Sequence, residues 1–202
     1  IFDMPQFSQS GWDVNQGEAI HLNSNYLNVA ENLVDPAHVS FVHPTTLGSS
    51  ASEDVPVEFE TEGDVIVAWR WIRNSPPIGF FKEFPGYKTN VDRWHYYYLH
   101  LPSIAVIDFG SIDSKEQIEE NQRHLGTQLF ALHFLTPVSS NLTIDRWMHL
   151  RNVAVGDENA SAKIHSMFRV AFAEDKKILE AIQEQIDHQQ NQNPVHIAID
   201  KG

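Results

Sequence analysis

The stretch "AFAEDKKILEAIQ", residues 171–183, belongs to a C-terminal third in which apolar side chains recur at helical spacing. The spacing predicts one long or broken helix from residue 157 to about residue 190. The apolar positions that carry this pattern are Ile164, Phe168, Phe172, Leu179, Ile182 and Ile186.

One carboxylate falls on this apolar stripe. Asp175 lies four residues before Leu179 and seven before Ile182, which places the three side chains on one face. A buried carboxylate costs several kcal/mol unless it is paired, protonated or bound to a metal. A carboxylate that only accepts backbone hydrogen bonds is the plain alternative. The neighbouring charged side chains are expected to point elsewhere: Glu174, Lys176 and Lys177.

A second polar pattern is "NLVDPAHVSFVHPTTLG", residues 32–48. A helix is expected from residue 26 to about residue 42, with a kink or two joined segments at Pro36. Three polar residues at intervals of three would lie along one side of it: Asn32, Asp35 and His38.

His43 follows His38 by five residues, or about 140° around an ideal helix, so a continuous helix would separate the two rings. However, Pro44 disfavours the α conformation at His43, and a helix that ends there lets His43 turn back toward His38. A pair of structural histidines is the alternative. Because the chain contains no cysteine, a metal would have to be bound by His with Asp or Glu, which suits Fe, Zn, Mn or Cu.

The remaining sequence is typical of an α+β protein with no internal repeat and no linker between domains. Strands are expected at residues 19–23, 57–63, 64–72, 91–101, 104–109, 125–136 and 142–152. One of these strands would place four side chains on a single face: Val65, Val67, Trp69 and Trp71. The segments expected to be irregular are the rest of residues 1–24, the loops 44–54 and 74–90, and a solvated loop or short helix at 111–124.

The net charge of −13 argues against nucleic acid or an anionic membrane as a partner. The same charge fits a soluble cytoplasmic protein or one that docks on a basic partner, and neither a run of 18 apolar residues nor a signal peptide is visible. The chain begins at Ile1 and reads as the middle of a longer polypeptide, with residues 1–202 forming one domain.

The two polar segments resemble the iron site of Rieske non-heme iron oxygenases, most closely the vanillate O-demethylase and dicamba monooxygenase type of oxygenase subunit. The resemblance implies a helix-grip (Bet v 1-like) fold, in which an antiparallel sheet wraps a long C-terminal helix around a substrate cavity. It extends over nearly the whole chain, including the tail "HIAIDKG".

By this resemblance, His38, His43 and Asp175 would bind one Fe(II). Asp35 would be the bridging carboxylate, which hydrogen-bonds a ligand imidazole such as His38 and carries electrons from the cluster of a neighbouring subunit. Asn32 would lie near the iron without binding it.

The resemblance also implies an oxygenase that uses O₂ to hydroxylate or oxidatively O-demethylate an aromatic or other apolar small molecule. Electrons would come from a reductase or ferredoxin through a [2Fe–2S] cluster, and the complete enzyme would be a homotrimer. The cluster requires cysteines that this chain lacks, so its domain is expected before Ile1. The isolated chain is therefore expected to be inactive with NADH.

The other histidines are less informative. His133, within an apolar strand, is a candidate for a polar contact to substrate. His95 and His100 fall on opposite strand faces and are interpreted as structural. His149 and Arg151 share a face with Trp147, where solvated, packing and ligand roles all remain open.

Two other functions fit the same residues. The first is a non-catalytic helix-grip domain that binds a hydrophobic small molecule, with structural histidines. The second is zinc-dependent hydrolysis with the same three ligands. Metal analysis of protein produced with iron would separate these alternatives from the oxygenase.

Overall fold

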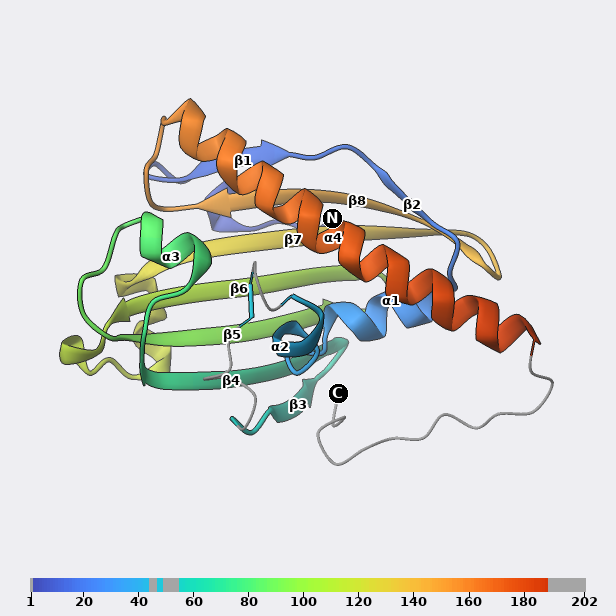
Figure 1. The fold of residues 1–202 in the computed structure, drawn as a ribbon, viewed down its shortest axis with the longest axis horizontal. Coiled ribbons are helices and arrows are strands. Elements are labelled where there is room, and N and C mark those ends of the chain that lie inside the picture. The colour runs from blue at the N-terminus through green and yellow to red at the C-terminus, as the bar shows by residue number, and fades with distance from the viewer. Residues whose placement is uncertain (1, 44–46, 49–54, 189–202) are drawn as a thin grey trace.

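The computed structural model describes residues 2–43, 47–48 and 55–188. An antiparallel eight-stranded sheet curves around one long helix, α4 (Glu158–His188), which crosses a single face of the sheet (Figure 1). The predicted α+β helix-grip fold is confirmed. The expected loop at residues 44–54 lies mostly outside the described residues, which include only 47 and 48 of it. The expected end of the helix near residue 190 lies wholly outside them.

The sheet is built mainly from consecutive antiparallel strands. Its order is β1-β8-β7-β6-β5-β4-β3, and β2 pairs with the other end of β8. The strands are β1 (Asp13–Gln16), β2 (Ile20–Leu22), β3 (Glu58–Glu62), β4 (Val65–Ser75), β5 (Val91–His100), β6 (Ile104–Asp113), β7 (Thr127–Ser139) and β8 (Leu142–Arg151). The short helices are α1 (Tyr26–Leu33), α2 (Val39–Val42), α3 (Gly79–Glu83) and the 3₁₀ segments η1 (Pro5–Phe7), η3 (Ser114–Glu116) and η4 (Glu120–Leu125).

All of these strands except β1 were predicted, and the omission of β1 has a local cause. The polar strand β1 was expected to be irregular, because its sequence DVNQ has no apolar alternation. It is held by pairing with β8 and by an ion pair of 2.5 Å between Asp13 and Arg151. His149 and Arg151 are fully buried, so a solvated role is excluded for both.

The buried face of α4 packs on the inner face of the sheet. It consists of Ala160, Ile164, Phe168, Ala171, Asp175, Leu179 and Gln183. The prediction that Ile182 and Ile186 belong to this face is wrong, because they are 43% and 52% exposed. The last turns of α4 extend past the ends of the strands (Figure 1), so no sheet lies beneath them.

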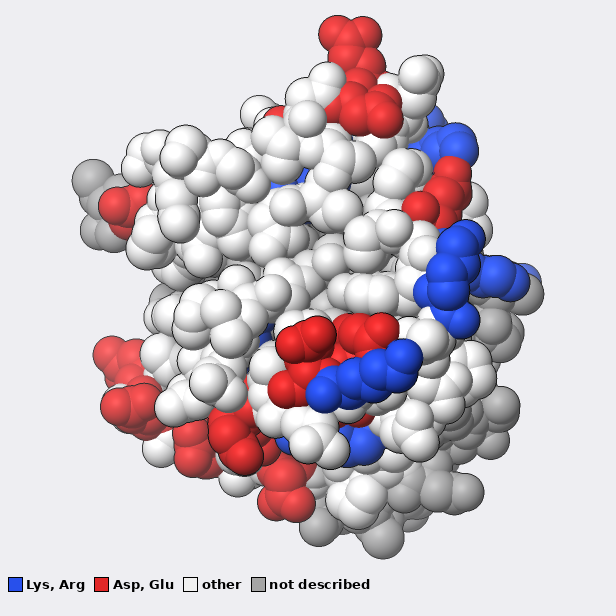
Figure 2. Space-filling model, turned by 90° about the vertical axis from the view of Figure 1, so that its left-hand side faces the viewer, with Lys and Arg blue, Asp and Glu red and all other residues white. Residues whose placement is uncertain are grey.

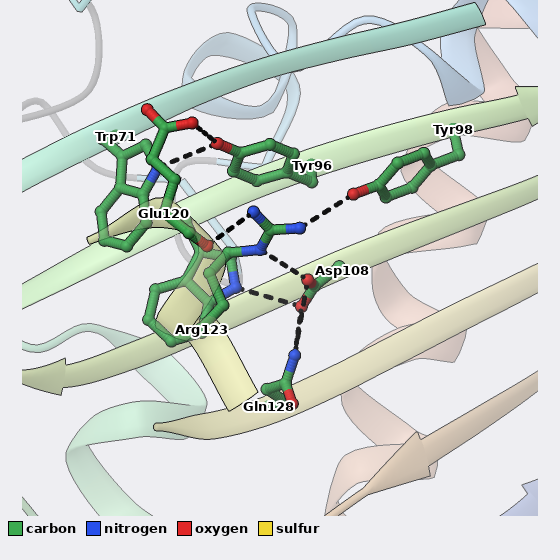
Figure 3. A network of polar contacts seen from close by, with 8 residues as sticks. Trp71, Tyr96, Tyr98, Asp108, Glu120, Arg123 and Gln128 are labelled. Atoms are coloured by element: carbon green, nitrogen blue, oxygen red, sulfur yellow. Dashed lines mark hydrogen bonds and ion pairs between the residues drawn. The ribbon is translucent and has the colours of Figure 1, made fainter. Parts of the chain in front are cut away.

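The outer face of the sheet carries an aromatic cluster. The predicted stripe of Val65, Val67, Trp69 and Trp71 lies here, against Trp94 and Tyr96. The segment expected to be a solvated loop or short helix contains the short 3₁₀ helices η3 and η4, and its Ile118 packs on this face instead of being solvated. Arg123 of η4 donates hydrogen bonds to Asp108 and Tyr98, within the network of Figure 3. Burial raises the pKa of Asp108, although Arg123 and Trp94 act in the opposite direction.

Acidic residues outnumber basic ones, with 27 Asp and Glu against 14 Lys and Arg. On the face shown in Figure 2, Asp and Glu side chains gather at the lower left, and most Lys and Arg side chains lie toward the right. Within the described part of the chain, none of the helices has the length and apolar character required to cross a lipid bilayer.

Candidate metal centre

The segment between α1 and α2 positions the first histidine. Helix α1 begins after Asn25, whose side chain accepts a hydrogen bond from the Leu27 N–H, and it ends at Leu33. The predicted interruption of the helix is confirmed. Because α1 ends there, Asp35 and His38 do not share a helix face with Asn32, and that expectation is wrong.

Asp35 organises the turn that follows α1. Its carboxylate accepts hydrogen bonds from the N–H groups of Ala37 (2.7 Å) and His38 (3.2 Å). His38 then occupies the N-cap position of α2. Burial raises the pKa of the Asp35 carboxyl, but the neighbouring His38 and these N–H groups outweigh it, and the net pKa is lowered.

The end of α2 turns His43 into the interior. His43 is the C-cap residue, with φ −116° and ψ 46°, and its side chain is only 2% exposed. Its carbonyl accepts hydrogen bonds from the N–H groups of Leu47 and Gly48. A Cβ at Gly48 would lie 2.4 Å from the Val39 carbonyl oxygen, so this close approach requires glycine.

Asp175 meets both histidines. Its Oδ1 lies 3.0 Å from His43 Nε2 and 3.6 Å from His38 Nε2, and one ligand atom from each residue can be chosen so that all three lie within 4.8 Å of one another. Asp175 belongs to the buried face of α4, as its spacing predicts. Two imidazole nitrogens and one carboxylate oxygen directed at a common point form a donor set suited to a transition metal. Among the described residues, no other group of three such side chains converges in this way.

Carboxylates also face the outer nitrogens of both imidazoles. Glu174 Oε2 lies 2.8 Å from His43 Nδ1, within hydrogen-bonding distance. Asp35 Oδ2 lies 3.7 Å from His38 Nδ1, too far for a hydrogen bond. Glu174 lies outside the buried face of α4, as predicted, but its contact with His43 was not expected. Asn32 Nδ2 donates to Asp175 Oδ1 at 3.5 Å.

The charges around His43 change its pKa. Burial lowers it, but hydrogen bonds and attraction from Asp175 and Glu174 outweigh burial and raise the pKa above its ordinary value. Negative charge therefore accumulates at this end of the cavity, which is the electrostatic condition that a bound cation requires.

A small cavity of about 30 Å³ adjoins the three residues. Its wall is mainly apolar: Leu33, Val39, Leu47, Ile107, Phe109, Ala131, Phe168 and Phe172, together with Asn32, Tyr97 and His133. His133 Nδ1 lies 2.7 Å from Asp145 Oδ2. Within the described residues, His133 Nε2 and the Tyr97 hydroxyl are buried without a hydrogen-bond partner.

Two further histidines lie outside this centre. His95 and His100 point to opposite faces of β5, as predicted: His95 stacks on Tyr97, and His100 packs against Phe2. Arg70 donates a hydrogen bond to His95 Nδ1. Burial, reinforced by Arg70 and Arg93, lowers the pKa of His95 well below its ordinary value.

The fold is that of a helix-grip domain, in which an antiparallel sheet curves around a long helix. Two histidines and a carboxylate near this helix form a candidate mononuclear metal centre. The family model described as "Vanillate O-demethylase oxygenase C-terminal domain" matches residues 22–202. The chain therefore belongs to this family, and the resemblance to Rieske-type oxygenases is confirmed.

Individual relatives agree with this assignment. The chain is 30% identical over 187 residues to the toluene-4-sulfonate monooxygenase system iron-sulfur subunit of Comamonas testosteroni, covering 91% of this chain and 54% of that protein. It is 24% identical over 196 residues to the vanillate O-demethylase oxygenase subunit of a Pseudomonas strain, covering 92% and 54%. The structure of dicamba monooxygenase bound to 3,6-dichlorosalicylic acid matches with a TM-score of 0.88 at 21% identity, covering 100% and 58%. The chain thus spans about half the length of these relatives.

Proposed function

We propose that this chain is the mononuclear-iron catalytic domain of a Rieske-type oxygenase that uses O₂ to hydroxylate or O-demethylate an aromatic or similar apolar molecule. The observation that carries the proposal is the convergence of His38, His43 and Asp175 beside an apolar cavity. Relatives named as monooxygenase and O-demethylase oxygenase subunits support the same reaction class.

The three side chains fit Fe(II) as ligands. Two imidazoles and one carboxylate on one side of the ion would leave positions open for O₂ beside the substrate. The chain's own residues would hold the ion and keep the reacting space dry: His43 is almost fully buried, and Phe168 and Phe172 line the cavity.

The cavity suggests how a substrate would be oriented. The His133–Asp145 pair and the Tyr97 hydroxyl would contact an oxygen-bearing group on an otherwise apolar ring, because these are polar groups in an apolar wall. A pocket for a drug-sized ligand has a volume of roughly 300 Å³ or more. A cavity of about 30 Å³ must therefore widen, by movement of side chains such as Phe172, before a ring can enter.

Electrons for this chemistry would come from outside the chain. The 202 residues contain no cysteine to hold a [2Fe–2S] cluster, and the relatives are about twice as long. The cluster would lie in an N-terminal domain. A cytoplasmic reductase or ferredoxin would supply the electrons to this cluster. Within a homotrimer, the cluster of one subunit would serve the iron of its neighbour through Asp35, which is 32% exposed.

Metal titration tests the proposal most directly. We expect the chain to bind one Fe(II), or Co(II) as a stable probe, and Asp175→Asn to bind at least 100-fold more weakly because it loses a ligand charge. The complete oxygenase should then consume O₂ with aromatic substrates. Absence of metal binding would favour a non-catalytic binding domain, and hydrolysis supported by zinc alone would favour a hydrolase.

A further inference from the structure

His43 has a carboxylate at each of its two ring nitrogens. Asp175 Oδ1 lies 3.0 Å from Nε2, and Glu174 Oε2 lies 2.8 Å from Nδ1. Because Glu174 and Asp175 are consecutive residues of α4, one short stretch of helix holds both edges of the same ring.

We propose that Glu174 is a positioning residue of the metal centre, acting through His43; the inference rests on the function proposed above. A neutral imidazole carries one N–H, and its other nitrogen provides the lone pair for a metal. By accepting a hydrogen bond from Nδ1, Glu174 selects the tautomer whose lone pair lies on Nε2, the nitrogen nearest Asp175. The same hydrogen bond fixes the ring plane and makes the ligand nitrogen more basic.

The two histidines differ in how firmly they are held. His38 Nδ1 has no hydrogen-bond partner among the described residues, and the facing carboxylate of Asp35 lies 3.7 Å away. The His38 side chain is 16% exposed, whereas that of His43 is 2% exposed. Glu174 therefore makes His43 the pre-oriented ligand.

The position of Glu174 separates this role from a general role in stability. Its side chain is 33% exposed, at the margin of the buried face of α4 rather than within it. Truncating a side chain at this margin removes little packing, so the main loss is the hydrogen bond to His43. Glu184, on the same helix and 70% exposed, is a matched control, because its ion-pair partner is His188 rather than a residue of the metal centre.

The experiment is a Co(II) titration of this chain, followed by visible absorption of the bound ion and by thermal unfolding without metal. We expect Glu174→Ala to weaken Co(II) binding by about 10- to 100-fold and to alter the absorption spectrum. Glu174→Gln keeps an oxygen that can accept the Nδ1–H, so it should restore most of the affinity and the spectrum. Glu184→Ala should match the wild type in both measurements.

The outcomes separate this inference from the function on which it rests. If the wild type binds no Co(II), both are overturned. If Asp175→Asn loses binding while Glu174→Ala keeps the wild-type affinity and spectrum, the metal centre stands and the role of Glu174 is overturned. If both Glu174 variants lose affinity equally and also unfold at lower temperature without metal, Glu174 supports the fold, and the positioning role is again overturned.

Discussion

Replacing His149 with leucine should remove a pH-dependent component of the stability of the fold. His149 lies on the inner face of β8 and is fully buried, and within the described residues neither ring nitrogen has a hydrogen-bond partner. Burial, reinforced by the charges of Arg151 and His165, lowers its pKa from 6.5 to about 4. The ring is packed as an apolar group against Trp147 and Phe168.

The lowered pKa of His149 decides in which direction stability changes with pH. Above pH 6.5 the histidine is neutral in both the folded and the unfolded chain, so it adds no pH dependence. Below pH 6.5 the unfolded chain binds a proton that the folded chain does not, and stability falls until the pH reaches about 4. For pKa values of 6.5 and about 4, the free energy of unfolding falls by about 2 kcal/mol between pH 7.5 and pH 5. The full loss at lower pH is about 3 kcal/mol.

Urea unfolding at pH 7.5 and pH 5 measures this contribution in wild type and His149→Leu. The wild type should lose about 2 kcal/mol more than the variant across this interval, because other titrating groups contribute equally to both. The control is His124→Gln, which removes an exposed histidine without changing the packing of the core. Equal losses in wild type and His149→Leu would refute the reasoning.

Three other predictions concern the metal centre. In the complete oxygenase, Asp35→Asn should keep most of its iron but lose most coupled turnover. A normal single-turnover rate would contradict the proposed electron path. Iron loss as complete as in His38→Ala would contradict it as well. This chain with a reductase and NADH should show no sustained substrate oxidation in an oxygen-uptake assay, and steady turnover would exclude the need for a separate cluster. Gly48→Ala should destabilise the fold by roughly 1–3 kcal/mol, since its Cβ would meet the Val39 carbonyl; an unchanged unfolding temperature would show that the turn adapts.

The place of Asp175 could be predicted because helical periodicity fixes the angle between residues. About 100° per residue put Asp175 on the face of Leu179, and both are buried. The same rule assigned Glu174 to another face and missed its contact with His43. Periodicity gives the direction of a side chain around the axis, but not which neighbouring segment lies beside the helix at that level.

The limits of the helical stripe have a similar cause. Ile182 and Ile186 continue the apolar pattern, yet they are 43% and 52% exposed, whereas Gln183 is the buried residue at this level and accepts a hydrogen bond from the N–H of Asn25. The break at Pro36 was predicted from the missing N–H of proline, but the turn that brings His38 beside Asp175 was not. That turn depends on two backbone hydrogen bonds to Asp35, which helical spacing does not describe.

The metal centre depends on the axial position of α4. A helix shifted by one residue moves by about 1.5 Å and turns by about 100°, which would carry Asp175 away from both histidines. Polar contacts near the start of α1 oppose such a shift. Glu180 accepts hydrogen bonds from the backbone and side chain of Asn23, and Gln183 accepts one from the N–H of Asn25. Apolar packing alone tolerates sliding, whereas these directed bonds specify one register. Glu180 and Gln183 therefore help to place Asp175 beside the two histidines, although they lie one to two turns beyond Asp175 and contact neither histidine.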